Sequence, residues 1–375
     1  MDALELMSGD AQTFIEKVWA SRVQIHQGRP ADYVGLLSFD DVDRLLTSTA
    51  LRTPALRVAD HGRVLQTAEF TRAATLAGVP LSGLVDARKT LDLFDGGATL
   101  VLQGLHRYWP PLTDLVRELE LSLGHPCQAN AYLTPPGSQG FARHSDTHDV
   151  FVFQTFGRKQ WEVQDENGQR DVLLEPGSCL YMPTGTPHAA RTQDSASLHV
   201  TIGINRITWR QTLEHLIQRV LSNDAYDASI PAGYLDDPAM LVPELSDRLE
   251  ALAQTLRDVD VDRATEMETT RFLTSRNAVL RGGLNDRIAM RHVTDDTLLR
   301  RRPGSPFVVR PDDDRVRVLL GDRELSMPAR VAGALIYIRD NHDFRPVKLT
   351  PWLDPQSRLV LAKRLVREGL LQVEV

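Results

Sequence analysis

Three residues near the middle of the chain have the types and spacing of metal ligands. His144 and Asp146 stand two positions apart in the stretch His144-Ser-Asp-Thr-His148. Alternate residues of a β-strand point to the same side, so a strand here would aim both side chains into the interior of a barrel. One imidazole and one carboxylate, completed by a second imidazole, form a site that suits non-haem Fe(II) and leaves coordination positions open.

The second imidazole has to come from a distant strand, and His188 has the sequence context for it. It follows a strand-like run over residues 178–182, which is flanked by a Pro-Gly turn and a Pro-Thr-Gly turn. A His-x-Asp pair alone is a weak signal, but the pair followed by this later pattern is more specific. We therefore predict His144, Asp146 and His188 as metal ligands, and His148 as a pocket neighbour or a rival ligand.

The residues around these ligands form short strand-like runs. Gly, Pro and Asn turn residues separate the runs, and many short strands at close spacing favour a sandwich or barrel. Short helices precede them, such as the helix predicted over residues 39–46 with Ser38 as its cap. The predicted strands cover residues 98–102, 128–133, 150–154, 160–163, 171–174, 178–182 and 198–204.

The pattern changes after residue 208. Residues 212–221 and 245–256 have apolar side chains at helical spacing, and these apolar faces need a partner, for which a second subunit is one option. The last part resembles a small α/β module. Its helices are predicted over residues 329–338 and 355–366, with a closing strand over 370–375, an order compatible with a winged helix. We expect three domains, over residues 1–208, 209–275 and 276–375.

Composition sets the broad class of the protein. The 375 residues carry a formal net charge of -7, which argues against a protein built around nucleic-acid binding. Cys127 and Cys179 are isolated, so we expect free thiols in a reducing compartment. We predict no signal peptide, and no stretch approaches the ~20 apolar residues that a membrane span needs. These features together favour a cytoplasmic protein that does not bind membranes.

A longer motif adds a family resemblance. The stretch from Asn130 to Asp146 includes Tyr132-Leu-Thr-Pro-Pro-Gly-Ser-Gln-Gly-Phe141, and Gly157-Arg-Lys-Gln-Trp161 follows it. Both resemble the JmjC-type ribosomal oxygenases of the cupin-4 group. The resemblance extends toward the N-terminus to about Leu37. It extends weakly into the regions after residue 208, whose order resembles the family's dimerisation and winged-helix parts.

The resemblance implies a double-stranded β-helix of the cupin, or jelly-roll, type that carries an Fe(II) centre on His144, Asp146 and His188. It implies 2-oxoglutarate as co-substrate, with its far carboxylate bound by Lys159. It also implies a homodimer that hydroxylates a histidine or arginine side chain of a ribosomal protein. Gly203 stands where some members carry a polar pocket residue. The side chains implied to line the pocket for co-substrate and substrate are Asn130, Tyr132 and Thr201.

Several side chains keep two interpretations. Tyr132 could hydrogen-bond in the pocket or belong to the core. His199 is more typical of a core histidine with satisfied hydrogen bonds than of a pocket residue. Trp161, Phe151 and Phe153 are best explained as packing inside the barrel.

Two alternative functions stay open on sequence alone. The same chemistry could act on a small molecule or a natural-product peptide, or a non-catalytic cupin could sense a metabolite and regulate through its winged helix. The last predicted helix carries basic residues that would suit DNA recognition. Its many leucine and valine residues favour a scaffold role instead. The basic residues are Arg358, Lys363, Arg364 and Arg367.

Overall fold

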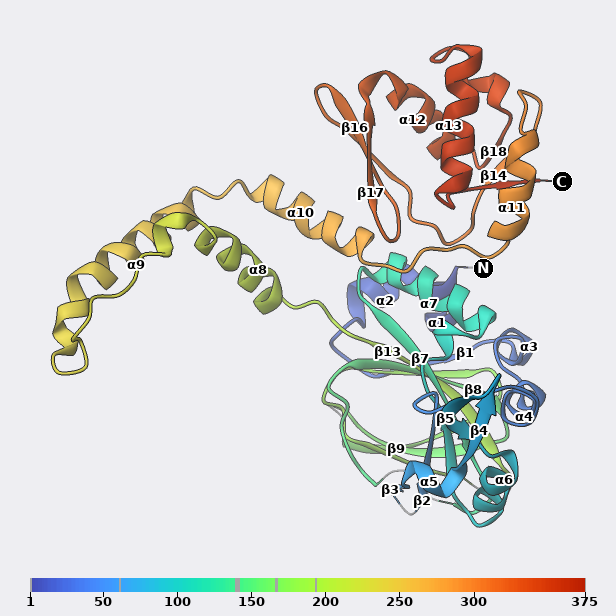
Figure 1. The fold of residues 1–375 in the computed structure, drawn as a ribbon. Coiled ribbons are helices and arrows are strands. Elements are labelled where there is room, and N and C mark those ends of the chain that lie inside the picture. The colour runs from blue at the N-terminus through green and yellow to red at the C-terminus, as the bar shows by residue number, and fades with distance from the viewer. Residues whose placement is uncertain (1, 61, 139–141, 166–167, 193, 375) are drawn as a thin grey trace. The chain divides into compact units, whose positions relative to one another are not determined.

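The computed structural model describes residues 2–60, 62–138, 142–165, 168–192 and 194–374. The chain divides into two compact units, Met1–Arg206 and Ile207–Val375 (Figure 1). In the part of the chain that the structure describes, no helix is both long enough and apolar enough to cross a membrane.

The first unit is built on a large and a small antiparallel sheet. The large sheet has the strand order β1-β11-β8-β13-β7-β6-β2-β3, and the small sheet the order β10-β9-β12. A separate hairpin pairs β4 with β5. The bounds are β1 Gln24–Gln27, β2 Leu56–Asp60, β3 Arg63–Val64, β4 Thr71–Leu76, β5 Val79–Val85, β6 Thr99–Leu102, β7 Cys127–Thr134, β8 Asp149–Phe156, β9 Lys159–Asp165, β10 Gly168–Leu174, β11 Ser178–Met182, β12 His188–Thr192 and β13 Ser197–Ile204.

Strand β8 is buried on both faces, and its alternating side chains belong to two different cores. Successive side chains of a strand point to opposite faces. Val150 and Val152 pack with residues of β9 and β10 in a core between the two sheets. Phe151 and Phe153 point the other way, into the larger core that the N-terminal helices cover. Both phenylalanines are core residues, but they pack under the N-terminal helices and not inside the barrel, which corrects the sequence-based expectation.

Helices cover the outer face of the large sheet. Helix α4 begins after Ser38, whose hydroxyl accepts the amide N–H of Asp41 in a capping box, as the sequence predicts. Helix α7 was not predicted, although Pro110 takes its first position and its leucines recur at helical spacing. The helices of this unit are α1 Ala3–Ser8, α2 Ala11–Lys17, α3 Pro30–Val34, α4 Phe39–Ser48, α5 Thr67–Phe70, α6 Ala87–Asp95, the 3-10 turn η1 Leu105–Arg107 and α7 Pro110–Leu123.

The second unit begins with helices α8, α9 and α10, none of which contains a buried residue. The remainder is a small α/β module with its own core. The predicted helix from residue 329 begins as a 3-10 turn, and helix α13 begins after Asp354 as expected. The α-helices are α8 Trp209–Leu221, α9 Val242–Arg257, α10 Val261–Thr274, α11 Gly283–Ala289, α12 Ala332–Asp340 and α13 Pro355–Arg367, and the 3-10 turns are η2 Asp224–Tyr226, η3 Pro238–Leu241, η4 Met290–His292, η5 Ala329–Val331 and η6 Pro346–Leu349.

Two small sheets complete this module, in the orders β18-β14-β19 and β15-β16-β17. Only β19 had been predicted. On helix α13, Arg358 is buried and forms an ion pair with Asp295. This arginine therefore joins the helix to the segment before β14. The bounds are β14 Leu299–Arg301, β15 Val308–Pro311, β16 Arg315–Leu319, β17 Glu324–Pro328, β18 Asp343–Phe344 and β19 Leu371–Val373.

Candidate metal centre

The predicted ligand pair does not lie in a strand, which corrects one step of the sequence argument. Strand β8 begins only at Asp149, and His144 forms an isolated antiparallel bridge with His188. In this bridge the N–H of His144 donates to the carbonyl of His188 at 3.0 Å, and the reverse bond measures 2.8 Å. This backbone pairing of the two histidines brings their side chains together.

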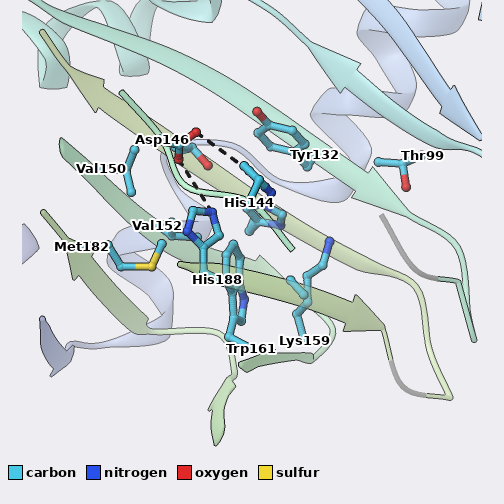
Figure 2. Close-up of a pocket in the computed structure, with 13 residues that line it drawn as sticks. Thr99, Tyr132, His144, Asp146, Val150, Val152, Lys159, Trp161, Met182 and His188 are labelled. Atoms are coloured by element: carbon cyan, nitrogen blue, oxygen red, sulfur yellow. Dashed lines mark ion pairs between the residues drawn. The ribbon is translucent and has the colours of Figure 1, made fainter. Parts of the chain in front are cut away.

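The three predicted ligands converge on one point (Figure 2). Nε2 of His144 lies 3.8 Å from Oδ1 of Asp146, and Nε2 of His188 lies 3.7 Å from Oδ2 of the same carboxylate. One ligand atom from each residue lies within 4.8 Å of the other two. A single ion could therefore contact all three side chains.

Backbone carbonyls orient both imidazoles. Nδ1 of His144 lies 2.8 Å from the carbonyl oxygen of Ala142, and Nδ1 of His188 lies 3.0 Å from that of Thr186. Because a carbonyl can only accept, each Nδ1 must carry the proton. Each Nε2 then presents a lone pair toward the centre, which is the usual arrangement of a metal-bound histidine.

The centre is closed on one side and open on the other. The side chain of His188 is 6% exposed, that of Asp146 is 30% exposed and that of His144 is 44% exposed. Burial is the main cause that lowers the pKa of His188, and the nearby His144 adds to it. A lowered pKa favours the neutral imidazole that metal binding needs.

The donor set fits a ferrous ion. Two neutral imidazoles and one carboxylate are the facial set of non-haem Fe(II) oxygenases, and they leave positions for other ligands. The open side at His144 gives such ligands access. By the chemistry of these donors, we consider the site suited to Fe(II).

Lys159 begins strand β9 and lies in the same pocket as the three ligands. It is 3% exposed, and its Nζ donates to Oγ1 of Thr134 at 3.0 Å. Burial lowers the pKa of its ammonium group to about 7. A buried ammonium is costly unless an anion pairs with it, so this residue is suited to a ligand carboxylate.

The pocket spans about 550 Å³, including its open mouth. Of the residues implied to line it, Tyr132 and Thr201 do so. Asn130 is not among the lining side chains in the described part of the chain, because its Oδ1 accepts the N–H of Gly104 at 3.0 Å. A role for Asn130 in the pocket therefore stays a prediction. The lining residues are Thr99, Tyr132, His144, Asp146, Val150, Val152, Lys159, Trp161, Met182, His188, Ala190, His199 and Thr201.

Two aromatic side chains line the pocket as well as the core, and Trp161 has its predicted packing role in the core between the two sheets. His199 is 3% exposed, its ring stacks on Tyr132 at 4.9 Å, and its Nδ1 has no hydrogen-bond partner among the described residues. Burial, followed by the charge of Lys159, keeps the pKa of His199 well below its ordinary value. Trp161 also lines the pocket, and its Nε1 has no partner in the same part of the structure. Both rings thus offer polar atoms to a ligand.

His148 is not part of the group of three close ligand atoms in the described residues. Its ring lies so close to Gly203 that a Cβ added to Gly203 would fall 2.7 Å from His148 Nε2. A glycine is therefore needed at position 203 for His148 to keep this place. The Gln139-Gly-Phe141 part of the sequence motif lies outside the described residues.

Comparison with known proteins supports the resemblance seen in the sequence. Residues 111–212 match the family described as the JmjC domain. The bifunctional lysine-specific demethylase and histidyl-hydroxylase NO66 of Branchiostoma floridae is 34% identical over 200 residues, which are 48% of this chain and 32% of that protein. Ribosomal oxygenase 1 of Danio rerio is 29% identical over 56% of this chain and 41% of its own length. The chain thus spans less than half the length of these curated relatives.

Solved structures show the same fold. The crystal structure of the Escherichia coli ribosomal oxygenase YcfD is similar with a TM-score of 0.57 and 18% identity, covering 97% of this chain and 98% of that one. A YcfD structure in complex with cobalt and 2-oxoglutarate is similar with a TM-score of 0.55, at 18% identity and the same coverage of both chains. The predicted JmjC, or cupin-type, fold is therefore confirmed.

Proposed function

We propose that this chain, which matches the JmjC domain over residues 111–212 and has the fold of the ribosomal oxygenase YcfD, is an Fe(II)- and 2-oxoglutarate-dependent oxygenase that hydroxylates a side chain of a protein. The observation that carries the proposal is the convergence of His144, Asp146 and His188 in the same pocket as the buried Lys159. The resemblance to ribosomal oxygenases adds a ribosomal protein as the substrate, and a histidine or arginine as the modified residue.

Each side chain has a defined part in this function. His144, Asp146 and His188 would hold Fe(II), and the bound iron with 2-oxoglutarate would supply the activation of O2 for insertion into a C–H bond. Lys159 would bind the far carboxylate of the co-substrate. Tyr132 and Thr201 would form the wall beside it. The protein itself would bind and orient the co-substrate and the substrate, and would keep bulk water out of the pocket.

The open side of the metal centre supports a protein substrate. His144 is 44% exposed, whereas Lys159, in the same pocket, is 3% exposed. A co-substrate could fill the closed end while a side chain from a large partner enters at the open end. A small-molecule substrate would need no such open side, so this feature favours the protein substrate over that alternative.

Intact-mass comparison of ribosomal proteins from cells with and without the gene tests the assignment. We expect one protein to be heavier by one oxygen atom only when the gene is present, and not when the gene encodes Asp146→Ala. The purified enzyme should form succinate together with the hydroxylated product, which a non-catalytic sensor would not. Unchanged masses in all ribosomal proteins would remove the ribosomal assignment.

We also propose that residues 1–208 form the catalytic domain, 209–275 a helical dimerisation region and 276–375 a winged-helix-like domain. The lack of buried residues in helices α8, α9 and α10 supports the second part. Leu245 and Leu249 lie one turn apart on α9 and are each more than half exposed. Apolar faces of this kind are suited to burial against a second copy.

Aspartate at positions 245 and 249 is expected to dissociate the dimer. A charged group buried in an apolar interface costs on the order of several kcal/mol. Analytical ultracentrifugation of Leu245→Asp/Leu249→Asp should show monomers where the wild type is dimeric. Leu76→Asp, a change at a leucine 70% exposed on the β4–β5 hairpin, is the matched control and should stay dimeric. A monomeric wild type, or a dimeric double variant, would contradict the proposal.

Co-substrate binding is expected to depend on pH through Lys159. The pKa of its ammonium in the empty pocket is about 7, and a bound carboxylate would favour the charged form. The affinity for 2-oxoglutarate should therefore be highest below this pKa and fall above it, by up to about tenfold per pH unit. Above this pKa, binding should be accompanied by uptake of a proton by Lys159. Anaerobic calorimetry of 2-oxoglutarate binding to the Mn(II)-loaded protein, in buffers of different ionisation enthalpy, measures both effects.

Lys159→Arg provides the control for this pH dependence. A guanidinium group stays charged over the whole range, so a variant that still binds 2-oxoglutarate should do so without proton uptake. Wild-type binding that is constant across the range and takes up no proton would contradict the lowered pKa of Lys159, and its role as carboxylate partner would then rest on Lys159→Met alone.

A further inference from the structure

A row of contacts joins the two segments that carry the predicted metal ligands, residues 144–149 and 183–188. We name this row the ligand clamp. At one end, the backbones of His144 and His188 exchange two hydrogen bonds. In the middle, the N–H of Gly185 donates to the carbonyl of Asp146 at 2.9 Å. At the other end, Oδ1 of Asp149 accepts the N–H of Thr184 at 2.8 Å and its hydroxyl at 2.6 Å.

The Asp149 end of the clamp is fixed to the protein core. Asp149 is the first residue of β8 and is fully buried. Its Oδ2 accepts the hydroxyl of Tyr181 at 2.5 Å, and Nε of Arg206 lies 3.0 Å from its Oδ1. The Tyr181 hydroxyl in turn accepts the N–H of Ala20. A buried carboxylate with donors on both oxygens is held rigidly, because any displacement would break several hydrogen bonds.

Thr184 transmits this fixed position to the ligands through a short turn. Gly185 has a φ of 84°, a left-handed conformation that glycine adopts without strain. The Thr186 hydroxyl donates to the carbonyl of Pro183 at 2.8 Å and closes the turn. The carbonyl of Thr186 then orients the ring of His188. The place of Thr184 thus sets both the backbone at Asp146 and the ring of His188.

Resting on the proposed metal-dependent function, we propose that Asp149 and Thr184 are positioning residues for the metal centre. Among the described residues, neither belongs to the lining of the pocket or to the group of three ligands. They act through the turn at residues 183–187, which holds Asp146 and His188 in the geometry of one binding site. Of the contacts that make up the clamp, the Thr184–Asp149 hydroxyl bond is the one made by two side chains, so a single substitution can remove it.

Thr184→Val tests the clamp because it removes the hydroxyl and keeps the β-branched shape and the backbone N–H. Metal affinity is measured with Mn(II) alone, by the electron paramagnetic resonance signal of free Mn(II), on the full chain. Loss of a partner outside the ligands costs roughly 10–100-fold in metal affinity, and we expect a loss in this range. Thr184→Ser, which keeps the hydroxyl, should recover most of the affinity.

Ser178→Ala is the matched control. Ser178 lies at the opposite end of β11 from this turn, and its hydroxyl donates to Gln27 at 2.7 Å, so the change removes a comparable hydrogen bond from the same strand. Unaltered Mn(II) affinity in Thr184→Val would overturn the proposal, and so would equal losses in Thr184→Val and Ser178→Ala. A wild type that binds no Mn(II) would instead remove the proposed metal centre, and the clamp with it.

Discussion

Replacing Asp146 with alanine is expected to abolish both metal binding and turnover. Asp146 supplies the only carboxylate among the three converging ligands of the described residues, and each of its oxygens faces one imidazole (Figure 2). Its loss leaves the two histidines, whose backbone bridge does not depend on Asp146. Both are neutral ligands, so no negative charge would remain to offset part of the charge of the divalent ion. The loss of metal affinity should exceed the about 10–100-fold loss that follows removal of a residue hydrogen-bonded to a ligand.

The measurement combines Fe(II) content after anaerobic loading with succinate formation. Asp171→Ala is the control, because Asp171 is an exposed carboxylate on strand β10 of the same unit. We expect the control to match the wild type in both assays. Turnover in Asp146→Ala at the wild-type rate would contradict the proposed metal site.

Replacing Lys159 with methionine is expected to weaken co-substrate binding without changing the affinity for the metal. The ammonium group of Lys159 is buried and donates to the hydroxyl of Thr134. Without it, a bound carboxylate would lose its main counter-charge. Removing one partner of a buried ion pair costs about 3–5 kcal/mol, which corresponds to roughly 10²–10³-fold or more in affinity. The KM for 2-oxoglutarate should rise accordingly, while Mn(II) affinity stays at the wild-type value.

Thermal unfolding separates this effect from damage to the fold. Burial lowers the pKa of Lys159, which means that the folded protein without co-substrate pays a cost for this side chain. Methionine has a similar length and no charge to desolvate. We therefore expect the midpoint of unfolding to rise in Lys159→Met while 2-oxoglutarate binding falls. A variant with unchanged affinity for 2-oxoglutarate would show that the carboxylate binds elsewhere.

Strands with a run of apolar or alternating residues bounded by turn residues were predicted well from the local sequence. The predicted run over residues 178–182 coincides with β11, and the run over 198–204 lies within β13. In β7, Ala129, Ala131 and Leu133 are buried in alternation. The turn residues between such runs set their ends. Strands β1 to β5, β12 and β14 to β18 were not predicted from the sequence, and most of them span five residues or fewer.

The three residues predicted as ligands do lie close together, although His144 and Asp146 do not belong to a strand. Residues 142–148 form no strand apart from the bridge at His144. The segment over residues 183–188 instead pairs with His144 and Asp146 through backbone hydrogen bonds. Such pairing joins parts of the chain that are distant in sequence, and no local rule of spacing contains it.

The same limit applies to the side chains that line the pocket. Asn130 and Thr201 are neighbours in the register of β7 and β13, yet Thr201 lines the pocket and Asn130 binds Gly104. Residue type and strand position did not distinguish the two. For His199 the sequence left a core and a pocket role open, and the structure shows both, because the ring is buried and lines the pocket beside Tyr132.

The most direct test of the metal centre is anaerobic titration of the protein with Fe(II) in the presence of 2-oxoglutarate, followed by visible absorption. Chelation of a ferrous ion by a 2-oxo acid gives a charge-transfer band, and it requires two open positions beside the protein ligands. We expect a band that saturates at one iron per chain in the wild type and is absent from His188→Ala. A wild type without this band, or the same band in His188→Ala, would contradict iron binding by His144, Asp146 and His188.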